Sequence, residues 1–202
     1  MSDRVRELLT SVELFGEMLE EELNDLTTLA QIKKLTKDTT VFHAGDPADA
    51  VFVVASGRVK VVITSSDGKE FILTVLGAGQ VFGEMALLES APRSASVVTL
   101  SAVELLVISR IDFQRLLDSN PRISQRLMAI LSRRLRRANT KMESLAYMDV
   151  AGRLARYLLD LARDHGQRLG NGWVVVRRST HSDIAHSIGT SRETVSDRKS
   201  VV

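Results

Sequence analysis

The chain has 202 residues, of which 44% are hydrophobic and 26% are charged, and its formal net charge is only +2. Such a length and composition are typical of one large or two small globular domains, and the charge is too small to indicate nucleic-acid binding by itself. The absence of cysteine excludes disulfides and cysteine-ligated metal sites, and no stretch has the roughly 20 apolar residues of a membrane span. We therefore expect a cytoplasmic protein that contacts no membrane.

The first segment of the chain has a helical pattern. Leucine and isoleucine recur at helical spacing over residues 3–35, with an interruption near residues 15–16. Three glutamates at positions 20–22 suit the start of a second helix, because acidic side chains are favourable near a helix N-terminus. The sequence predicts two helices here, to which we assign no chemistry.

Residues 39–108 have a different pattern, in which short β-branched runs are separated by glycine-containing turns. Asp67-Gly68 between two such runs is a strong hairpin signal. Many short strands at regular spacing predict a roll or barrel that closes on itself. We expect this part of the chain to be a jelly-roll-like double-stranded β-helix. The runs expected to be strands are 51–55, 58–63, 71–75, 95–98 and 103–108.

Residues 82–97, which read FGEMALLESAPRSASV, carry the clearest chemistry. Gly83 permits a tight turn, and Arg93 can hold two phosphate oxygens in a fork. Ser94 adds a hydroxyl donor, whereas the carboxylate of Glu84 would repel a phosphate unless it faced a sugar hydroxyl. The combination suits a ribose that carries a phosphate. The alternative is a loop with an exposed arginine and a structural glutamate.

The string resembles the phosphate-binding cassette of cyclic-nucleotide-binding domains. This resemblance implies that Glu84 binds the ribose 2′-hydroxyl and that Arg93 pairs with the cyclic phosphate. It also implies that a cradle of backbone amides and one hydroxyl completes the site, from Gly83, Met85, Ala86 and Ser94.

A long helix is predicted over residues 122–148, after Asn120-Pro121 breaks a shorter helix that Ser109 caps. Its narrow apolar seam predicts a twofold dimer with the same helix of a second chain. The alternative is that the seam packs only on its own domain. The seam consists of Leu127, Leu131, Leu135, Ala138, Met142 and Leu145.

The order of roll, cassette and long helix resembles the bacterial cyclic-AMP receptor protein/FNR superfamily. In its cyclic-AMP receptors, two polar residues of the long helix bind the adenine. The matching positions are Ala138, which departs from the pattern, and Asn139, with Thr140 next. The resemblance implies cAMP as an allosteric ligand, with cGMP as the alternative because a hydroxyl at Ser94 goes with guanine in kinase relatives. It implies neither a metal nor an enzyme.

A helix-turn-helix is predicted over residues 179–196, after a helix at 150–164 and a short strand at 173–176. Gly189 allows the turn, and Arg192 and Glu193 open a second helix whose N-terminus can read guanine and cytosine edges. The string Ser-Arg-Glu-Thr-Val resembles the recognition helix of the superfamily; an ordinary helical hairpin is the alternative. Hydroxyls expected to contact DNA phosphates are those of Thr180, Ser182, Ser191 and Ser196.

The segment after Ser196 departs from the superfamily. Asp197 stands where a second base-reading arginine is expected, and only five residues follow instead of an apolar stripe and a two-stranded wing. Because a carboxylate near phosphates is repulsive, we expect an incomplete winged helix that binds DNA poorly.

The sequence thus predicts an α+β protein with three parts: a cyclic-nucleotide-binding roll (1–121), a dimerisation helix (122–148) and a helix-turn-helix domain (149–202). The predicted function is a dimeric, cyclic-nucleotide-responsive transcription regulator that binds a pseudo-palindromic operator and, by the resemblance, RNA polymerase. The alternative is a cyclic-nucleotide-binding module that regulates a protein partner, with DNA binding impaired in this chain.

Two further classes of protein fit less well. A cupin-like metalloenzyme would need clustered histidines, and the four histidines are scattered. A haem sensor of the same superfamily would not need the nucleotide cassette. The histidines are His43, His165, His181 and His186.

Overall fold

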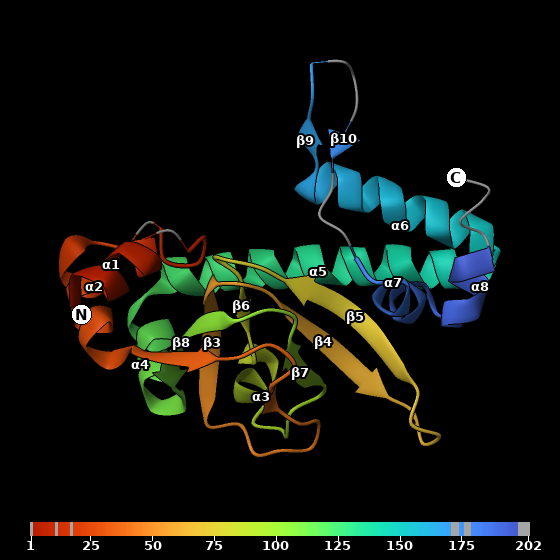
Figure 1. Ribbon diagram of the computed structural model, residues 1–202. Coiled ribbons are helices and arrows are strands. Elements are labelled where there is room, and N and C mark those ends of the chain that lie inside the picture. The colour runs from red at the N-terminus through yellow and green to blue at the C-terminus, as the bar shows by residue number, and fades with distance from the viewer. Residues whose placement is uncertain (1, 11, 17, 171–173, 176–178, 198–202) are drawn as a thin grey trace. The chain divides into compact units, whose positions relative to one another are not determined.

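The computed structural model describes residues 2–10, 12–16, 18–170, 174–175 and 179–197 (Figure 1). The chain divides into two compact units. The first comprises residues 1–63 and 73–133, and the second comprises residues 64–72 and 134–202. Helices and antiparallel sheets confirm the predicted α+β class.

Two four-stranded sheets form the roll, as expected, in the orders β1-β8-β3-β6 and β2-β7-β4-β5. Their residues belong to the first unit, apart from residue 64 of β4 and residues 70–72 of β5, which belong to the second. The pairs β1–β8, β8–β3, β3–β6, β2–β7 and β7–β4 are antiparallel. The strands are β1 (Gln31–Leu35), β2 (Thr40–Phe42), β3 (Ala50–Ser56), β4 (Val59–Thr64), β5 (Glu70–Leu76), β6 (Val81–Phe82), β7 (Ser96–Thr99) and β8 (Val103–Ser109).

Strand β3 is buried on both faces, which explains its continuous apolar sequence. Ala50, Phe52 and Val54 point into a core with residues of β7 and β8. Val51 and Val53 point into a second core that the helices cover. The roll is therefore filled on one side of this strand by the facing sheet and on the other by helices.

The helices of the first unit are α1 (Ser2–Thr10), α2 (Glu20–Leu29), α3 (Glu84–Leu88), α4 (Arg110–Ser119) and the first turns of α5 (Pro121–Tyr147). The predicted start of α2 is confirmed, and the Glu22 carboxylate accepts a 2.8 Å hydrogen bond from the backbone N–H of Leu19. Ser109 caps α4 as predicted, since its Oγ accepts from the N–H of Asp112.

The prediction of helix through residue 35 is wrong for its last five residues. Residues 31–35 form β1, which pairs with β8 from Gln31 opposite Val107 to Leu35 opposite Val103. The leucine spacing of α2 continues by chance to Ile32, but pairing with a distant strand outweighs this local pattern.

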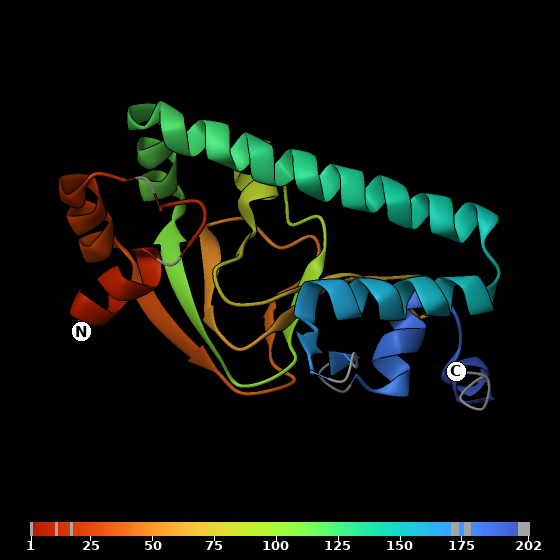
Figure 2. The same cartoon turned by 90° about the horizontal axis from the view of Figure 1, so that it is seen from above.

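The second unit contains α6 (Val150–His165), β9 (Gln167–Arg168), β10 (Val174–Val175), α7 (His181–Ile188) and α8 (Arg192–Asp197) (Figure 2). Asp149 caps α6 as predicted, accepting a 2.8 Å hydrogen bond from the N–H of Gly152. A small core joins the three helices through Leu154, Ala185, Ile188 and Val195. Of the helices in the described ranges, none has the length and apolar character needed to cross a bilayer.

Some predictions fall on residues that lie outside the described ranges. These are parts of the turn at 170–172 and the strand at 173–176, and the last five residues, 198–202.

Candidate functional site

The predicted cassette begins at a turn that favours glycine. Gly83, the N-cap of α3, has φ 81° and ψ 1°, in the left-handed region. A Cβ built on Gly83 would lie 2.7 Å from Nη1 of Arg93. Both the backbone conformation and the close approach of Arg93 therefore require a residue without a side chain.

The Arg93 guanidinium is buried and fixed on two sides. Its Nη1 donates a 2.7 Å hydrogen bond to the carbonyl of Gly83, and its Nη2 donates another of 2.7 Å to the carbonyl of Ala50. Its Cζ lies 4.3 Å from the ring centroid of Phe42. With only 4% of Arg93 exposed, two carbonyls hold the edge of the cation and an aromatic ring covers one face.

The charge of Arg93 has acidic neighbours, of which Asp49 forms an ion pair with it. The Asp49 Oδ1 lies 3.5 Å from Nη2 of Arg93, and the Asp49 side chain is 89% exposed. Burial lowers the pKa of Arg93, while the charges of Asp49, Asp46 and Glu84 oppose this effect. Arginine nevertheless stays charged at ordinary pH.

Within the described part of the chain, Nε of Arg93 has no hydrogen-bond partner. Buried polar groups usually have partners, and a buried cation favours an anion. The arrangement therefore fits an anionic group such as a phosphate.

The other predicted cassette residues divide into two sets. Glu84 is 2% exposed and lies near enough to Arg93 to affect its pKa, and Ala86 is also buried. The side chains of Met85 and Ser94 are exposed. The structure therefore brings Glu84 and Arg93 together, while the roles of the cassette residues toward a ligand stay predictions.

Asn139 and Thr140 lie on α5 in the second unit, whereas the cassette belongs to the first. Asn139 is exposed, and Thr140 donates a 3.1 Å hydrogen bond from Oγ1 to the carbonyl of Arg136. Their contact with a base stays a prediction.

Sequence reasoning missed Phe42 and Ala50, which hold the face and edge of Arg93. They belong to β2 and β3, in different sheets. No local pattern connects them with residues 82–97. The alternation along β3 was the one available signal, because it places Ala50 and Phe52 on the same face.

The predicted turn between α7 and α8 is formed by Gly189, which has φ 67° and ψ 51° and is the C-cap of α7. Arg192 and Glu193 are exposed at the start of α8. Hydrogen bonds from its own backbone N–H and from Ser191 hold the pKa of Glu193 below its usual range. Glu193 is therefore a carboxylate at neutral pH, as an acceptor for cytosine would have to be.

Two of the four predicted phosphate-binding hydroxyls are helix caps. Thr180 Oγ1 accepts from the N–H of Asp183 at 3.0 Å, and Ser191 Oγ accepts from the N–H of Thr194 at 3.3 Å. Ser182 is partly buried and Ser196 is exposed. Contacts of these residues with DNA stay predictions.

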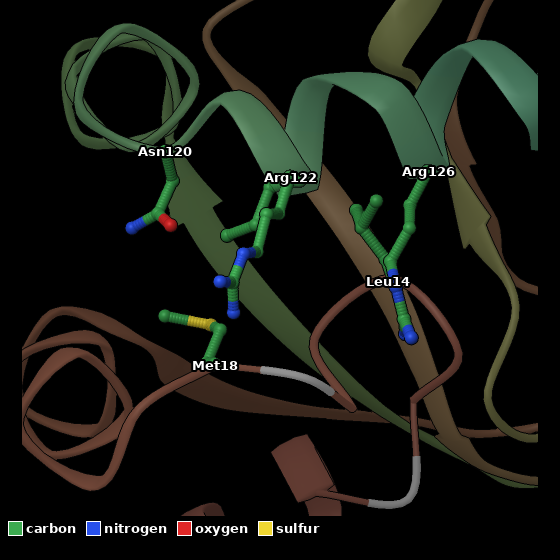
Figure 3. Close-up of a pocket in the computed structure, with 6 residues that line it drawn as sticks. Leu14, Met18, Asn120, Arg122 and Arg126 are labelled. Carbon is green, nitrogen blue, oxygen red and sulfur yellow. The ribbon is translucent and has the colours of Figure 1, made fainter.

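A pocket lies between the α1–α2 segment and the first turns of α5 (Figure 3). Arg126 donates to the carbonyl of Glu13 at 2.5 Å, and Asn120 donates to the Glu22 carboxylate at 2.9 Å. None of the residues that line the pocket was predicted to bind a ligand or DNA, so we assign the pocket no function. They are Leu14, Met18, Asn120, Arg122, Ile123 and Arg126.

Comparisons with known proteins match the two parts of the chain that contain these residues. The cyclic nucleotide-binding domain family matches residues 32–120, and the Crp-like helix-turn-helix domain family matches residues 152–198. A CRP-like cAMP-activated global transcriptional regulator of Mycobacterium tuberculosis is 34% identical over 189 residues, covering 94% of this chain and 84% of the relative. The chain belongs to the CRP/FNR family of transcription regulators.

Other members of the CRP/FNR family are similarly close. The cyclic AMP receptor protein of Thermus thermophilus is 37% identical over 183 residues, covering 91% of this chain and 82% of the relative. The structure of the c-di-GMP responsive global regulator CLP of Xanthomonas campestris matches with a TM-score of 0.79 at 29% identity, over 90% of each chain. The relative from Mycobacterium tuberculosis is named as a transcriptional regulator, which is the class of protein predicted for this chain.

Proposed function

We propose that this chain is a homodimeric transcription regulator that cAMP switches, that binds a pseudo-palindromic operator and that contacts RNA polymerase. The observation that carries the ligand assignment is the buried cation of Arg93, hydrogen-bonded to neutral carbonyls beside Glu84. Arg93 pairs with the cyclic phosphate and Glu84 binds the ribose 2′-hydroxyl. The rest of the site consists of Gly83, Met85, Ala86, Ser94, Asn139 and Thr140.

The choice of cAMP is supported by the names of two relatives, one cAMP-activated and the other a cyclic AMP receptor. A structural relative is named as responsive to c-di-GMP. Calorimetric titration of the chain with cAMP, cGMP and c-di-GMP tests the choice directly. We expect the tightest binding for cAMP, and tighter binding of either guanine nucleotide would refute it.

Dimerisation is supported by the exposed part of the α5 seam. Leu127 is 3% exposed and belongs to the core of its own unit, so the start of the seam packs internally. Leu135, Met142 and Leu145 are 63%, 58% and 39% exposed. Large apolar side chains at heptad spacing on one helix favour a second helix as partner.

Sedimentation velocity tests the dimer. The wild type should sediment as a dimer. The double variant Leu135→Glu/Met142→Glu should sediment as a monomer, because association would bury the two new carboxylates of each helix. Glu143→Gln, on an exposed position of the same helix, is the control. A wild type that is monomeric at micromolar concentration would contradict the proposal.

DNA binding is supported by the exposed Arg192 and Glu193 on α8. Allosteric coupling is reciprocal, so operator DNA and cAMP should tighten each other's binding by the same factor. Asp197 is exposed at the end of α8 and would repel phosphates, so Asp197→Arg should strengthen operator binding about tenfold. Fluorescence anisotropy with labelled operator measures both effects, and unchanged affinity in either experiment would contradict the corresponding claim.

A further inference from the structure

Three phenylalanines form a cluster beside the cassette arginine. The ring centroids of Phe42 and Phe52 are 5.6 Å apart, those of Phe42 and Phe82 are 6.0 Å apart, and those of Phe52 and Phe82 are 5.2 Å apart. Phe42 comes from β2 and the other two from β3 and β6, so the cluster joins the two sheets of the roll. Its position is fixed by the fold and not by a flexible loop.

The Arg93 guanidinium lies against this cluster. Its Cζ is 4.3 Å from the Phe42 centroid and 5.6 Å from the Phe52 centroid. A guanidinium is planar, so it can stack on an aromatic face while its edge remains available for hydrogen bonds. Cζ of Arg93 lies over the Phe42 ring while Nη1 and Nη2 donate to the carbonyls of Gly83 and Ala50.

The two sets of contacts restrict different motions. The carbonyls fix the direction of the Arg93 edge, and the Phe42 ring, 4.3 Å from Cζ, adds a barrier to rotation of the guanidinium plane. Nε of Arg93 remains without a hydrogen-bond partner in the described part of the chain. A donor held in one plane loses little conformational freedom when an anion binds, which improves affinity.

We infer that Phe42 is a positioning residue of the nucleotide site: its ring fixes the plane of the Arg93 guanidinium for the ligand phosphate. This inference rests on the proposed function. Phe42 is partly buried and packs against its core, so its ring contacts both the other two phenylalanines and Arg93.

The test compares cAMP affinity in three variants. Phe42→Leu keeps an apolar side chain but removes the aromatic face, and should weaken cAMP binding about 3- to 30-fold. Phe42→Tyr keeps the face and should bind within about twofold of the wild type. Phe113→Leu alters a buried phenylalanine in the other core of the same unit; it should lower the melting temperature and leave affinity unchanged.

A second measurement reads the Phe42–Arg93 contact without ligand. Nitrogen NMR of the Arg93 side chain should show slow rotation of the guanidinium in the wild type and in Phe42→Tyr. Rotation should be faster in Phe42→Leu, in which only the two carbonyl hydrogen bonds remain to oppose it. A loss of affinity that is equal in Phe42→Leu and Phe113→Leu, or unchanged rotation in Phe42→Leu, would overturn the inference. If the wild type bound no cyclic nucleotide, both the proposed function and the positioning role of Phe42 would be overturned. Slow rotation of the Arg93 guanidinium in that case would show that the Phe42–Arg93 contact exists without serving a nucleotide.

Discussion

Each unit of the molecule holds a cation over a phenylalanine ring. In the first unit, Arg93 lies 4.3 Å from the Phe42 centroid and donates to two backbone carbonyls. In the second, Nζ of Lys141 lies 4.6 Å from the Phe71 centroid and donates to the carbonyl of Ile72 at 2.6 Å. Both cations thus share a ring and a backbone carbonyl, but Arg93 is more deeply buried and has carboxylates nearby, so the sites differ in the cation and in its neighbours.

Burial lowers the pKa of both side chains, with different consequences. Arg93 remains charged at ordinary pH, so its site permanently favours an anion. Burial lowers the pKa of Lys141 to about 8, so this side chain can lose its proton near physiological pH. Arg93 is therefore suited to bind a phosphate. Lys141 can instead lose its proton, and the neutral amine is less unfavourable than the ammonium in a buried position.

The largest effect should follow removal of the arginine. Arg93→Ala deletes the buried donor for the ligand phosphate and should cost about 2–5 kcal/mol of cAMP binding. Arg93→Lys should recover only part of this loss. An ammonium cannot bind two phosphate oxygens, contact the Phe42 ring and donate to both backbone carbonyls at the same time. Calorimetry measures both losses.

The control for these variants is Arg115→Ala, which removes one positive charge from an exposed position on α4. It should leave cAMP affinity unchanged. If Arg93→Lys bound cAMP as tightly as the wild type, the distinction drawn between the two cations would be wrong.

The second effect concerns Gly83 and Gly68, which share φ of 81°. A Cβ on Gly83 would lie 2.7 Å from Nη1 of Arg93, whereas a Cβ on Gly68 would have nothing within 4 Å. Gly83→Ala should therefore destabilise the protein by about 2–4 kcal/mol and Gly68→Ala by about 1 kcal/mol, since the second change adds backbone strain alone. Chemical denaturation measures the two free energies of unfolding, and equal losses would show that Arg93 moves aside without cost.

The cassette could be predicted from sequence because residues 82–97 are contiguous. Its glycine turn, buried glutamate and arginine all lie within one string, so their chemistry can be inferred together. The partners of Arg93 could not be predicted, because Phe42 and Ala50 become its neighbours only when two sheets pack together. A local pattern carries no information about such contacts.

The same reason explains two other differences between sequence and structure. Residues 31–35 continue the leucine spacing of a helix, yet pairing with β8 makes them a strand. The heptad seam of α5 includes Leu127, which packs in the core of its own unit, while Leu135 remains exposed. Periodicity locates an apolar face but does not say what covers it.

The third prediction concerns the pH dependence of stability. The pKa of Lys141 is lowered from 10.5 to about 8 in the folded protein, so the unfolded chain binds more protons between these pH values. Stability should therefore rise with pH through this window, and Lys141→Met should abolish the rise. After allowance for solvent screening at a partly exposed side chain, we expect a change on the order of 1–3 kcal/mol, measured by denaturation at pH values from about 7 to 10.5.

Lys37→Met provides the matched control for this pH dependence, because Lys37 is an exposed lysine of the first unit. Its pH profile should follow that of the wild type. If the free energy of unfolding changed with pH between 8 and 10.5 in the same way in the wild type and in Lys141→Met, the lowered pKa of Lys141 would be contradicted.

The smallest effect should come from the ring beneath the lysine. Phe71→Leu removes the aromatic face that favours the ammonium form, at a cost of about 0.5–1 kcal/mol. Because the charged form loses a favourable contact while burial persists, the pKa of Lys141 should fall further below about 8. NMR titration of the lysine side chain measures this change, with Leu73→Ala on the exposed face of β5 as the control. A pKa that rises toward 10.5 in Phe71→Leu would mean that water enters and hydrates the ammonium, so that the ring acts by excluding solvent and not by attracting the charge.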